Sequence, residues 1–104
     1  MTPRVFALQY REHLQYDEAE KYGAVSYLTR LEWNAGQEKT KSRIELEIIH
    51  GLREYRPGVD FLLPSGSQPA QVLLGRILER VFVDKEHQLL YWAPRREEYT
   101  ITTI

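Results

Sequence analysis

Three histidines are the side chains of this sequence that titrate near neutral pH, and they stand far apart. They are His13, His50 and His87. Metal sites and acid–base pairs commonly use short spacings such as HxH or HxxxH, which these three lack. The chain also has no cysteine, which excludes thiolate nucleophiles, disulfides and cysteine-based zinc sites. We therefore expect structural or solvent-exposed histidines, no metal site and no cofactor.

Motifs for nucleophilic or phosphate chemistry are missing from the sequence as well. The serine–glycine–serine stretch at residues 65–67 follows a proline and lacks the G-x-S-x-G context of a nucleophile elbow. The glycines form neither a GxGxxG fingerprint nor a P-loop. Asp60 precedes an apolar run, and without a second carboxylate beside it we assign it a capping or turn role. We therefore expect no catalytic residue and no enzymatic activity.

Basic residues offer one candidate binding face. Lys39, Lys41 and Arg43 occupy alternate positions, so an extended strand would place all three on the same side. From that side they could contact phosphates or an acidic protein. Glu38 and Glu45 lie close by in the sequence and weaken the positive potential of this face.

Aromatic residues beside arginines form the second candidate binding surface. The last fifteen residues contain Tyr91, Trp92, Arg95, Arg96 and Tyr99. Exposed aromatic rings next to guanidinium groups can anchor a protein interface or stack on nucleobases. A competing interpretation places Trp92 in the core and Tyr91 over its rim, because neighbours in a strand point to opposite sides.

A β-hairpin is the element that we expect to position the basic residues. Apolar residues alternate with polar ones through residues 24–33 and again through residues 40–49, which is typical of half-buried strands. Residues 34–36 supply turn chemistry between them. Gly51 suits a bulge that would let the second strand continue.

Shorter patterns predict the elements around this hairpin. Residues 5–11 alternate as a strand, and residues 17–21 suit a loop or a single helical turn. Proline and glycine at the second and third positions of residues 56–59 favour a type II turn. Residues 64–69 are rich in structure breakers. Residues 100–104 are rich in β-branched side chains and are expected to close an edge of the sheet.

Two interpretations compete for the second part of the chain. Apolar residues at spacings of three and four predict an amphipathic helix over residues 68–80, with Ser67 as its N-cap and Pro69 in its first turn. Gly75 would then lie in mid-helix, at a cost of about 1 kcal/mol. The alternative is one long strand over residues 71–83 that bends at Gly75.

The strand interpretation carries a family resemblance. The stretch from Gly75-Arg76-Ile77 to Asp84, followed by residues 90–92, resembles the central hairpin of an SH3-like small barrel. The resemblance covers about a quarter of the chain and rests on alternation. It implies a small antiparallel barrel.

Composition and charge complete the prediction. With 42% hydrophobic and 28% charged residues, the sequence is typical of a globular protein, and we expect one domain spanning residues 1–104. The expected fold is mainly β, a small antiparallel barrel or curved sheet with at most one helix near residues 68–80. The net charge of −1 lacks the basic excess of most nucleic-acid-binding domains. No signal-peptide pattern or long apolar run is present, so we expect a cytoplasmic protein without membrane binding.

Three function classes remain open. The leading hypothesis is a non-enzymatic protein–protein interaction or regulatory module that binds another protein, or itself, through a strand edge and the aromatic–arginine surface. The alternative is a small nucleic-acid-binding β-barrel that uses Lys39, Lys41 and Arg43, and whose binding would be strongly salt-dependent. The third is a small hydrolase or lyase with a site of scattered histidine, aspartate and glutamate residues.

Overall fold

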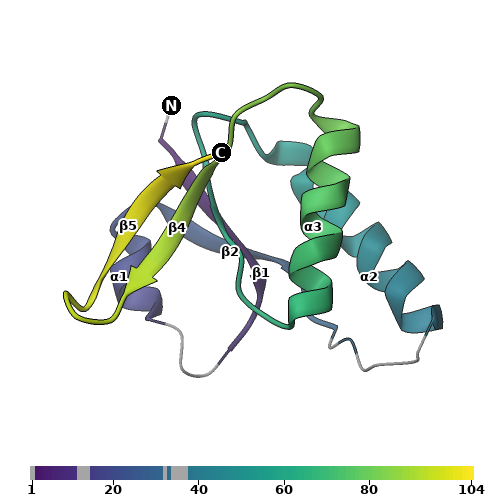
Figure 1. Ribbon diagram of the computed structural model, residues 1–104, viewed down its shortest axis with the longest axis horizontal. Helices are drawn as coiled ribbons and strands as arrows, with labels where there is room; N and C mark the ends of the chain where they lie inside the picture. Colours follow the sequence, from purple (N-terminus) through teal and green to yellow (C-terminus); the bar gives the residue numbers. More distant parts are fainter. Residues whose placement is uncertain (1, 12–14, 32, 34–37) are drawn as a thin grey trace.

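A mixed five-stranded sheet organises the residues that the structure describes, which are 2–11, 15–31, 33 and 38–104. The structure is a computed structural model, drawn in Figure 1. In spatial order the strands are β2 (Ala24–Thr29), β1 (Arg4–Gln9), β3 (Phe61–Leu63), β4 (Gln88–Ala93) and β5 (Glu98–Thr103). The first four strands in this order run parallel to one another, and β5 runs antiparallel to β4.

Helices cover both faces of this sheet. The helices α2 (Glu38–Gly51) and α3 (Gln68–Val81) lie together against one face (Figure 1). The short helix α1 (Tyr16–Glu20) packs on the opposite face, and a 3₁₀ turn, η1 (Leu52–Glu54), follows α2 directly. Each parallel crossover thus contains a helix, as parallel pairing requires.

The inner strand β1 is buried on both of its sides. Phe6 and Leu8 pack into the cluster beneath α2 and α3, whereas Val5 and Ala7 pack into the cluster on the α1 side. An uninterrupted apolar run of this kind is typical of the inner strand of a parallel sheet covered on both faces. The core therefore consists of two layers of side chains with β1 between them.

The expectation of a mainly β, antiparallel barrel or curved sheet with at most one helix is wrong. Residues 38–51 form α2 instead of the second strand of a hairpin. Ile44 and Ile48 are fully buried, whereas Leu46 between them is 68% exposed. Together with buried Leu52 they repeat every four residues, which is the helical period, so packing on the sheet selects the helix over the alternating strand.

The first strand of the expected hairpin exists, but its partner is different. Residues 24–29 form β2, which pairs in parallel with β1 rather than with residues 40–49. Gly51 is the last residue of α2 and not a bulge. A Cβ on Gly51 would press against Leu28, so its missing side chain lets α2 pack closely on β2.

The helix alternative is confirmed for residues 68–80. The Ser67 hydroxyl accepts a hydrogen bond from the Ala70 N–H at 3.4 Å, and Pro69 lies in the first turn. A Cβ on Gly75 would meet nothing within 4 Å, so this glycine faces open space. The SH3-like resemblance required a strand in this region. It is wrong, because these residues form α3 and their apolar spacing buries one face of that helix.

Several local predictions are confirmed. Residues 5–11 contain most of β1, residues 17–21 contain most of the helical turn α1, and residues 100–104 contain most of the edge strand β5. The turn at residues 56–59 also forms, and Gly58 takes the left-handed φ of 80° that a type II turn demands at its third position. Short-range turn and strand signals therefore hold where tertiary packing does not oppose them.

Asp60 has the structural role that its position suggested. Its fully buried carboxylate accepts hydrogen bonds from the Arg4 N–H at 2.9 Å and from the Arg56 N–H at 2.8 Å. The Arg56 guanidinium approaches it at 2.7 Å. Burial alone would raise the pKa of Asp60, but the hydrogen bonds from Arg56 and Arg4 outweigh it and hold that pKa below its ordinary value. Asp60 thus joins the start of β1 to the turn before β3.

Candidate interaction surface

The β4–β5 hairpin brings five predicted binding residues together. Tyr91 and Trp92 lie in β4, Arg95 and Arg96 lie in the turn, and Tyr99 lies in β5. Trp92 stands directly opposite Tyr99 across the hairpin. Because the hairpin joins residues close in the chain, these five were brought together by local structure alone.

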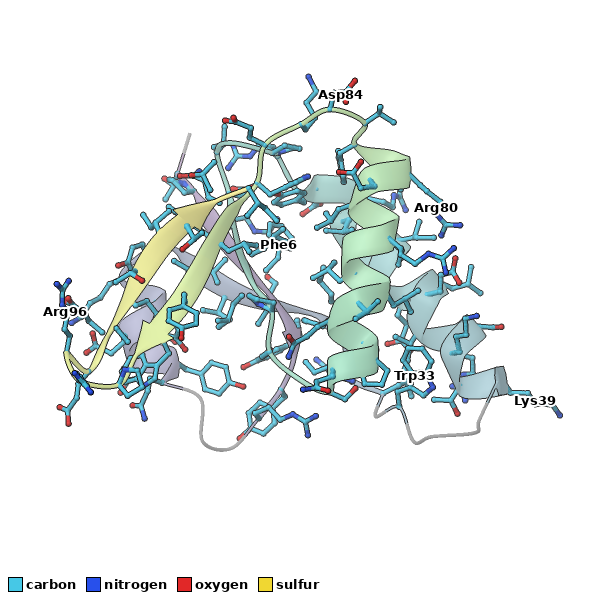
Figure 2. All side chains as sticks on the ribbon, viewed as in Figure 1. Phe6, Trp33, Lys39, Arg80, Asp84 and Arg96 are labelled. Atoms are coloured by element: carbon cyan, nitrogen blue, oxygen red, sulfur yellow. The ribbon has the colours of Figure 1, made fainter. Side chains whose placement is uncertain are left out.

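The aromatic members of this hairpin differ in exposure. Tyr91 is 65% exposed, whereas Tyr99 is 4% exposed. Trp92 is half-buried and packs edge-to-face on Tyr99, with ring centroids 5.0 Å apart. Arg95 and Arg96 are exposed, and Figure 2 shows Arg96 at the tip of the hairpin. The accessible part of the predicted surface therefore consists of Tyr91 and the two arginines.

Tyr99 fastens the hairpin to the rest of the molecule. The Tyr22 hydroxyl donates to the Tyr99 carbonyl oxygen at 2.8 Å, beside α1. Burial raises the pKa of Tyr99, so its phenol stays neutral. With Trp92 and Leu90, Tyr99 belongs to the core cluster on the α1 side. The hairpin is thus held in a fixed position rather than hinged from the sheet.

The backbone of β5 presents a row of polar groups away from β4. His87 and Ile104 exchange two backbone hydrogen bonds, of 2.8 and 2.9 Å. Hydrogen-bonded pairs alternate along an antiparallel ladder, so the even-numbered residues of β5 also bond to β4. The N–H and C=O groups of the odd-numbered residues, among them Ile101 and Thr103, therefore point outward at the edge of the sheet.

The side chains along this edge do little to protect it. Ile101 is 48% exposed, and Ile104 just beyond β5 is 62% exposed. Residues 99–104 contain no charged residue and no proline. Lysine, proline and bulges are the usual devices that keep an edge strand from pairing with another chain. The described edge of β5 carries none of them, which makes it a template for strand addition.

The basic residues predicted to share a face do not do so. In α2, Lys39 and Arg43 are four residues apart and both exposed, but Lys41 projects in a different direction. Lys41 is half-buried and lines a groove between α2 and α3 with Trp33 and Arg76. Figure 2 shows Lys39 at the outer end of α2. The predicted phosphate-binding face depended on a strand that is absent.

The histidines are placed separately. His87 is 5% exposed, and its Nδ1 lies 2.6 Å from the Tyr55 hydroxyl. Burial raises the pKa of Tyr55 and lowers that of His87, so this hydrogen bond joins a neutral phenol and a neutral imidazole. His50 is exposed in α2, and His13 lies outside the described residues. The described part of the chain contains no group of three or more histidine, aspartate or glutamate side chains arranged to hold a metal ion.

The outward-facing amides of β5 were not identified from the sequence as particular residues. The signal that could have found them is the uncharged, β-branched run at residues 100–104, combined with the pairing of β4 and β5. Compared with known proteins, the chain matches no family model, no curated protein and no solved structure. Across the described ranges, no helix is long and apolar enough to cross a membrane. Inferences about function therefore rest on the geometry of the molecule itself.

Proposed function

We propose that this protein is a non-enzymatic interaction module that binds a second copy of itself, edge to edge, through β5. The observation that carries the proposal is the row of outward backbone groups along residues 99–103 of β5, which contain no charged residue and no proline. Strand addition to such an edge draws its affinity from main-chain hydrogen bonds and its specificity from the side chains beside them. Two sheets joined in this way would form one continuous sheet.

A second copy fits this edge because one register pairs every outward group. In the antiparallel register centred on Ile101, that residue faces Ile101 of the second copy, and Tyr99 faces Thr103 of the second copy at both ends. Each outward residue then meets another outward residue, which is the condition for hydrogen-bonded pairs. The Tyr99 carbonyl already accepts from the Tyr22 hydroxyl but retains a second lone pair.

Side-chain chemistry agrees with the same register. The two Ile101 side chains meet on the α1 side of the sheet, and Thr100 meets Thr102 of the second copy on the other side. Glu98 faces Ile104, so no ionisable side chain of one copy opposes one of the other. Apolar and threonine cross-strand pairs contribute about 0.2–1 kcal/mol each, whereas like charges placed opposite one another destabilise.

The accessible aromatic and basic residues would flank this interface. Tyr91 is paired with Thr100 and lies one strand inward from the edge. Arg95 and Arg96 occupy the hairpin turn next to the start of β5. We assign these three side chains to the rim of the interface, where polar and aromatic groups exclude water around a paired centre.

Sedimentation velocity over a concentration series tests the proposal with the variant Ile101→Pro. The Ile101 N–H points away from β4, so proline removes an outward donor without removing a bond of the β4–β5 ladder. Two central hydrogen bonds disappear from the symmetric pair. At about 1 kcal/mol each, their loss predicts self-association at least tenfold weaker than in the wild type.

Ile101→Thr is the matched control, because it changes the side chain and keeps the amide. We expect this variant to self-associate far more strongly than Ile101→Pro. Circular dichroism on both variants checks that the monomer fold is kept. A wild type that stays monomeric at every concentration contradicts the second copy as partner, and undiminished association of Ile101→Pro contradicts β5 as the interface.

A further inference from the structure

The pair formed by His87 and Ile104 closes the β4–β5 hairpin at its base. Their backbones exchange two hydrogen bonds, of 2.8 and 2.9 Å, just beyond the pairing of Gln88 with Thr103. Figure 1 shows this end of β5 beside the start of β4, where the chain returns from α3. The backbone position of His87 therefore determines whether the last residues of β5 stay on the sheet.

The imidazole of His87 is packed among aromatic rings. It stacks on the Tyr55 ring with centroids 5.7 Å apart, and the Phe82 ring meets it edge-on at 6.1 Å. Tyr55 in turn packs edge-on against Phe6 at 5.6 Å, within the core beneath α2 and α3. His87 is 5% exposed, and its Nδ1 lies 2.6 Å from the Tyr55 hydroxyl. These contacts hold the ring, and with it the backbone of His87, in place.

The elements packed on this ring offer little compensation for a positive charge. Tyr55 contributes a phenol that burial keeps neutral by raising its pKa. Asp60, which also acts on Tyr55, is already paired with an arginine. Glu79 of α3 is the carboxylate that acts on His87, but it is exposed, so water screens its charge. In β5 and just beyond it, residues 99–104 supply no charged side chain.

The segment that leads into β4 adds no buried charge to these surroundings. Asp84, Lys85 and Glu86 precede His87 and are all exposed. A charge on the imidazole would therefore lie among uncharged rings. Burial accordingly lowers the pKa of His87.

A proton can nevertheless reach this imidazole from outside. No fully buried side-chain nitrogen or oxygen of the described residues lacks a hydrogen-bond partner. The contacts described for His87 involve Nδ1 and the ring face but not Nε2, so Nε2 lies at the surface. The ring is open enough to take up a proton and buried enough for its charge to be unfavourable.

Releasing the end of β5 uncovers little apolar surface. Residues 101–104 are all exposed, and Ile104 is 62% exposed. Local opening is favoured where few apolar contacts are lost. Tyr99, by contrast, is 4% exposed and packs on Trp92, so the opening stops before it reaches this residue.

We propose that His87 is a pH-sensitive switch for the end of β5. A proton on its imidazole turns the ring into water, breaks the backbone bonds to Ile104 and releases residues 102–104 from β4, while the parallel strands stay folded. The edge-to-edge pair uses the outward groups of Thr103, so this release also weakens self-association. The effect on self-association rests on the proposed function, whereas the release itself does not.

NMR titration of the full chain at low protein concentration, from about pH 7.5 to 5, tests the release. We expect the amide signals of Thr102 and Ile104 to move toward random-coil positions, with the same midpoint as the imidazole signals of His87. The signals of Phe6 and Leu62 in the parallel strands should stay native. Strand-end signals that remain native at pH 5 overturn the proposal. A transition in which Phe6 and Leu62 change together with them also overturns it, because that is global unfolding.

His50→Gln is the matched control, because it removes an exposed histidine from α2. Its spectra should show the same transition at the strand end as the wild type. His87→Gln cannot take up the proton and should show no transition, and if this variant does not fold, the wild-type titration decides alone. A transition that disappears in His50→Gln would assign the switch to the wrong histidine.

Sedimentation velocity at the two ends of this pH range measures the effect on the edge. A symmetric pair contains two switches, so we expect self-association about tenfold weaker or more at pH 5 than at pH 7.5. Release of the strand end in a protein that is monomeric at every pH contradicts the edge-to-edge pair and supports the switch. Self-association that keeps its strength after the strand end is released contradicts the coupling between the two.

Discussion

The two edge strands of the sheet, β2 and β5, differ in how far other parts of the chain contact their outer edges. The end of β2 is covered by a side chain from α2: Glu47 accepts from the Thr29 hydroxyl at 2.9 Å and from the Arg30 N–H at 3.4 Å. At the β5 edge the Tyr22 hydroxyl engages the Tyr99 carbonyl, whereas among the contacts described no side chain engages the outward backbone groups of Ile101 and Thr103. A carboxylate therefore closes part of the β2 edge within the chain, while most of the outward backbone of β5 stays available.

Because of this difference, we expect the parallel strands to determine the stability of the fold and the outer edge of β5 to determine association. The parallel part of the sheet is stabilised by buried polar groups whose partners lie on distant segments, as with Asp60 and Gln9. The antiparallel hairpin draws on local pairing and on the packing of Tyr99 against α1. Substitutions in the first region should change the free energy of unfolding, and substitutions on the outer edge should change association.

The largest expected effect is the loss of folding stability in Asp60→Asn, in the parallel part of the sheet. An amide would present a donor where Arg4 and Arg56 also donate, and the buried Arg56 contact would lose its counter-charge. We expect a loss of about 3–5 kcal/mol in the free energy of unfolding, measured by urea denaturation. Asp84→Asn, at an exposed residue with a positive φ of 59° that asparagine tolerates, should change it by less than about 0.5 kcal/mol. Equal effects at the two sites would contradict this account of Asp60.

The next largest effect is expected at Gly66, which has a φ of 107° beside the Gln9 side chain. Gly66→Ala would strain the backbone and drive a Cβ into the Gln9 amide, with a loss of about 2 kcal/mol. Gly75→Ala is the matched control with the opposite sign, because its Cβ meets nothing within 4 Å in mid-helix. It should stabilise by up to about 1 kcal/mol. Denaturation curves of both variants check this pair, and a stabilised Gly66→Ala would contradict it.

A smaller loss of stability is expected at low pH. It involves His87, whose backbone pairs with that of Ile104 at the base of the hairpin. Burial lowers the pKa of His87 from 6.5. Just below pH 6.5 its imidazole is therefore protonated in the unfolded chain but still neutral in the folded state. Stability should therefore fall as the pH drops from 6.5 to the folded pKa, with a slope of up to about 1.4 kcal/mol per pH unit. His87→Gln should remove this slope and the exposed control His50→Gln should keep it. Thermal denaturation from pH 7 to 5 measures the slopes, and a slope that survives in His87→Gln would assign it to another group.

The smallest effect on folding is expected for a charge on the open edge. Ile101→Lys should change the free energy of unfolding of the monomer by less than about 0.5 kcal/mol, while it blocks edge pairing. Val25→Lys in β2, where the side chain packs on the core cluster, should cost about 1–3 kcal/mol. Urea denaturation at low protein concentration compares the two. A large loss in Ile101→Lys would show that the outer edge also contributes to folding.

The sequence predicted the elements that local chemistry determines. The capping hydroxyl of Ser67, the left-handed Gly58 and the β-branched edge strand are all set within a few residues. In α2 the same residues satisfied two periods at once, because Ile44 and Ile48 fit both alternation and a four-residue repeat. Only contact with the sheet distinguishes these two periods, and that contact is made by distant segments.

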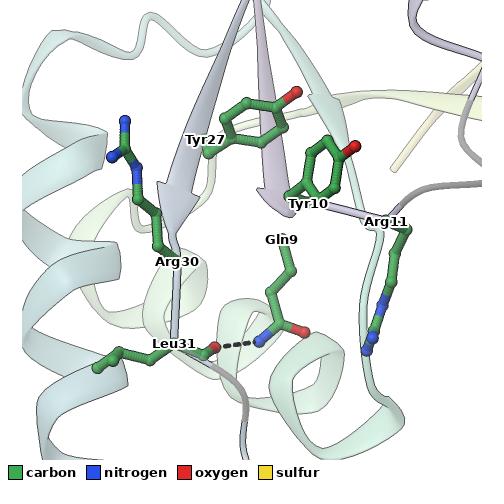
Figure 3. Close-up of a pocket in the computed structure, with 6 residues that line it drawn as sticks. All are labelled: Gln9, Tyr10, Arg11, Tyr27, Arg30 and Leu31. Atoms are coloured by element: carbon green, nitrogen blue, oxygen red, sulfur yellow. Dashed lines mark hydrogen bonds between the residues drawn. The ribbon is translucent and has the colours of Figure 1, made fainter.

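The candidate binding residues show the same limit, because local sequence predicts proximity only for residues that are close together in the chain. The hairpin residues from Tyr91 to Tyr99 lie together because their proximity needs only a short turn, although Tyr99 is buried and their binding role stays a prediction. Lys41 was separated from Lys39 and Arg43 once their segment became a helix. The cavity that Tyr10 and Tyr27 line at the carboxyl ends of β1 and β2 (Figure 3) was missed because it depends on parallel pairing between these strands, and no short-range pattern encodes that pairing.

The sheet order also has a consequence for how the chain is made. The pairing of β1 with β3 brings Val5 next to Phe61 and therefore closes a long loop of chain. The strands β4 and β5, by contrast, are joined by a short turn. Loop closure over such a separation is slow compared with hairpin formation. During synthesis β5 is the last strand of this sheet to leave the ribosome. We therefore expect the pairing of β1 with β3, rather than the β4–β5 hairpin, to set the rate at which this sheet is completed.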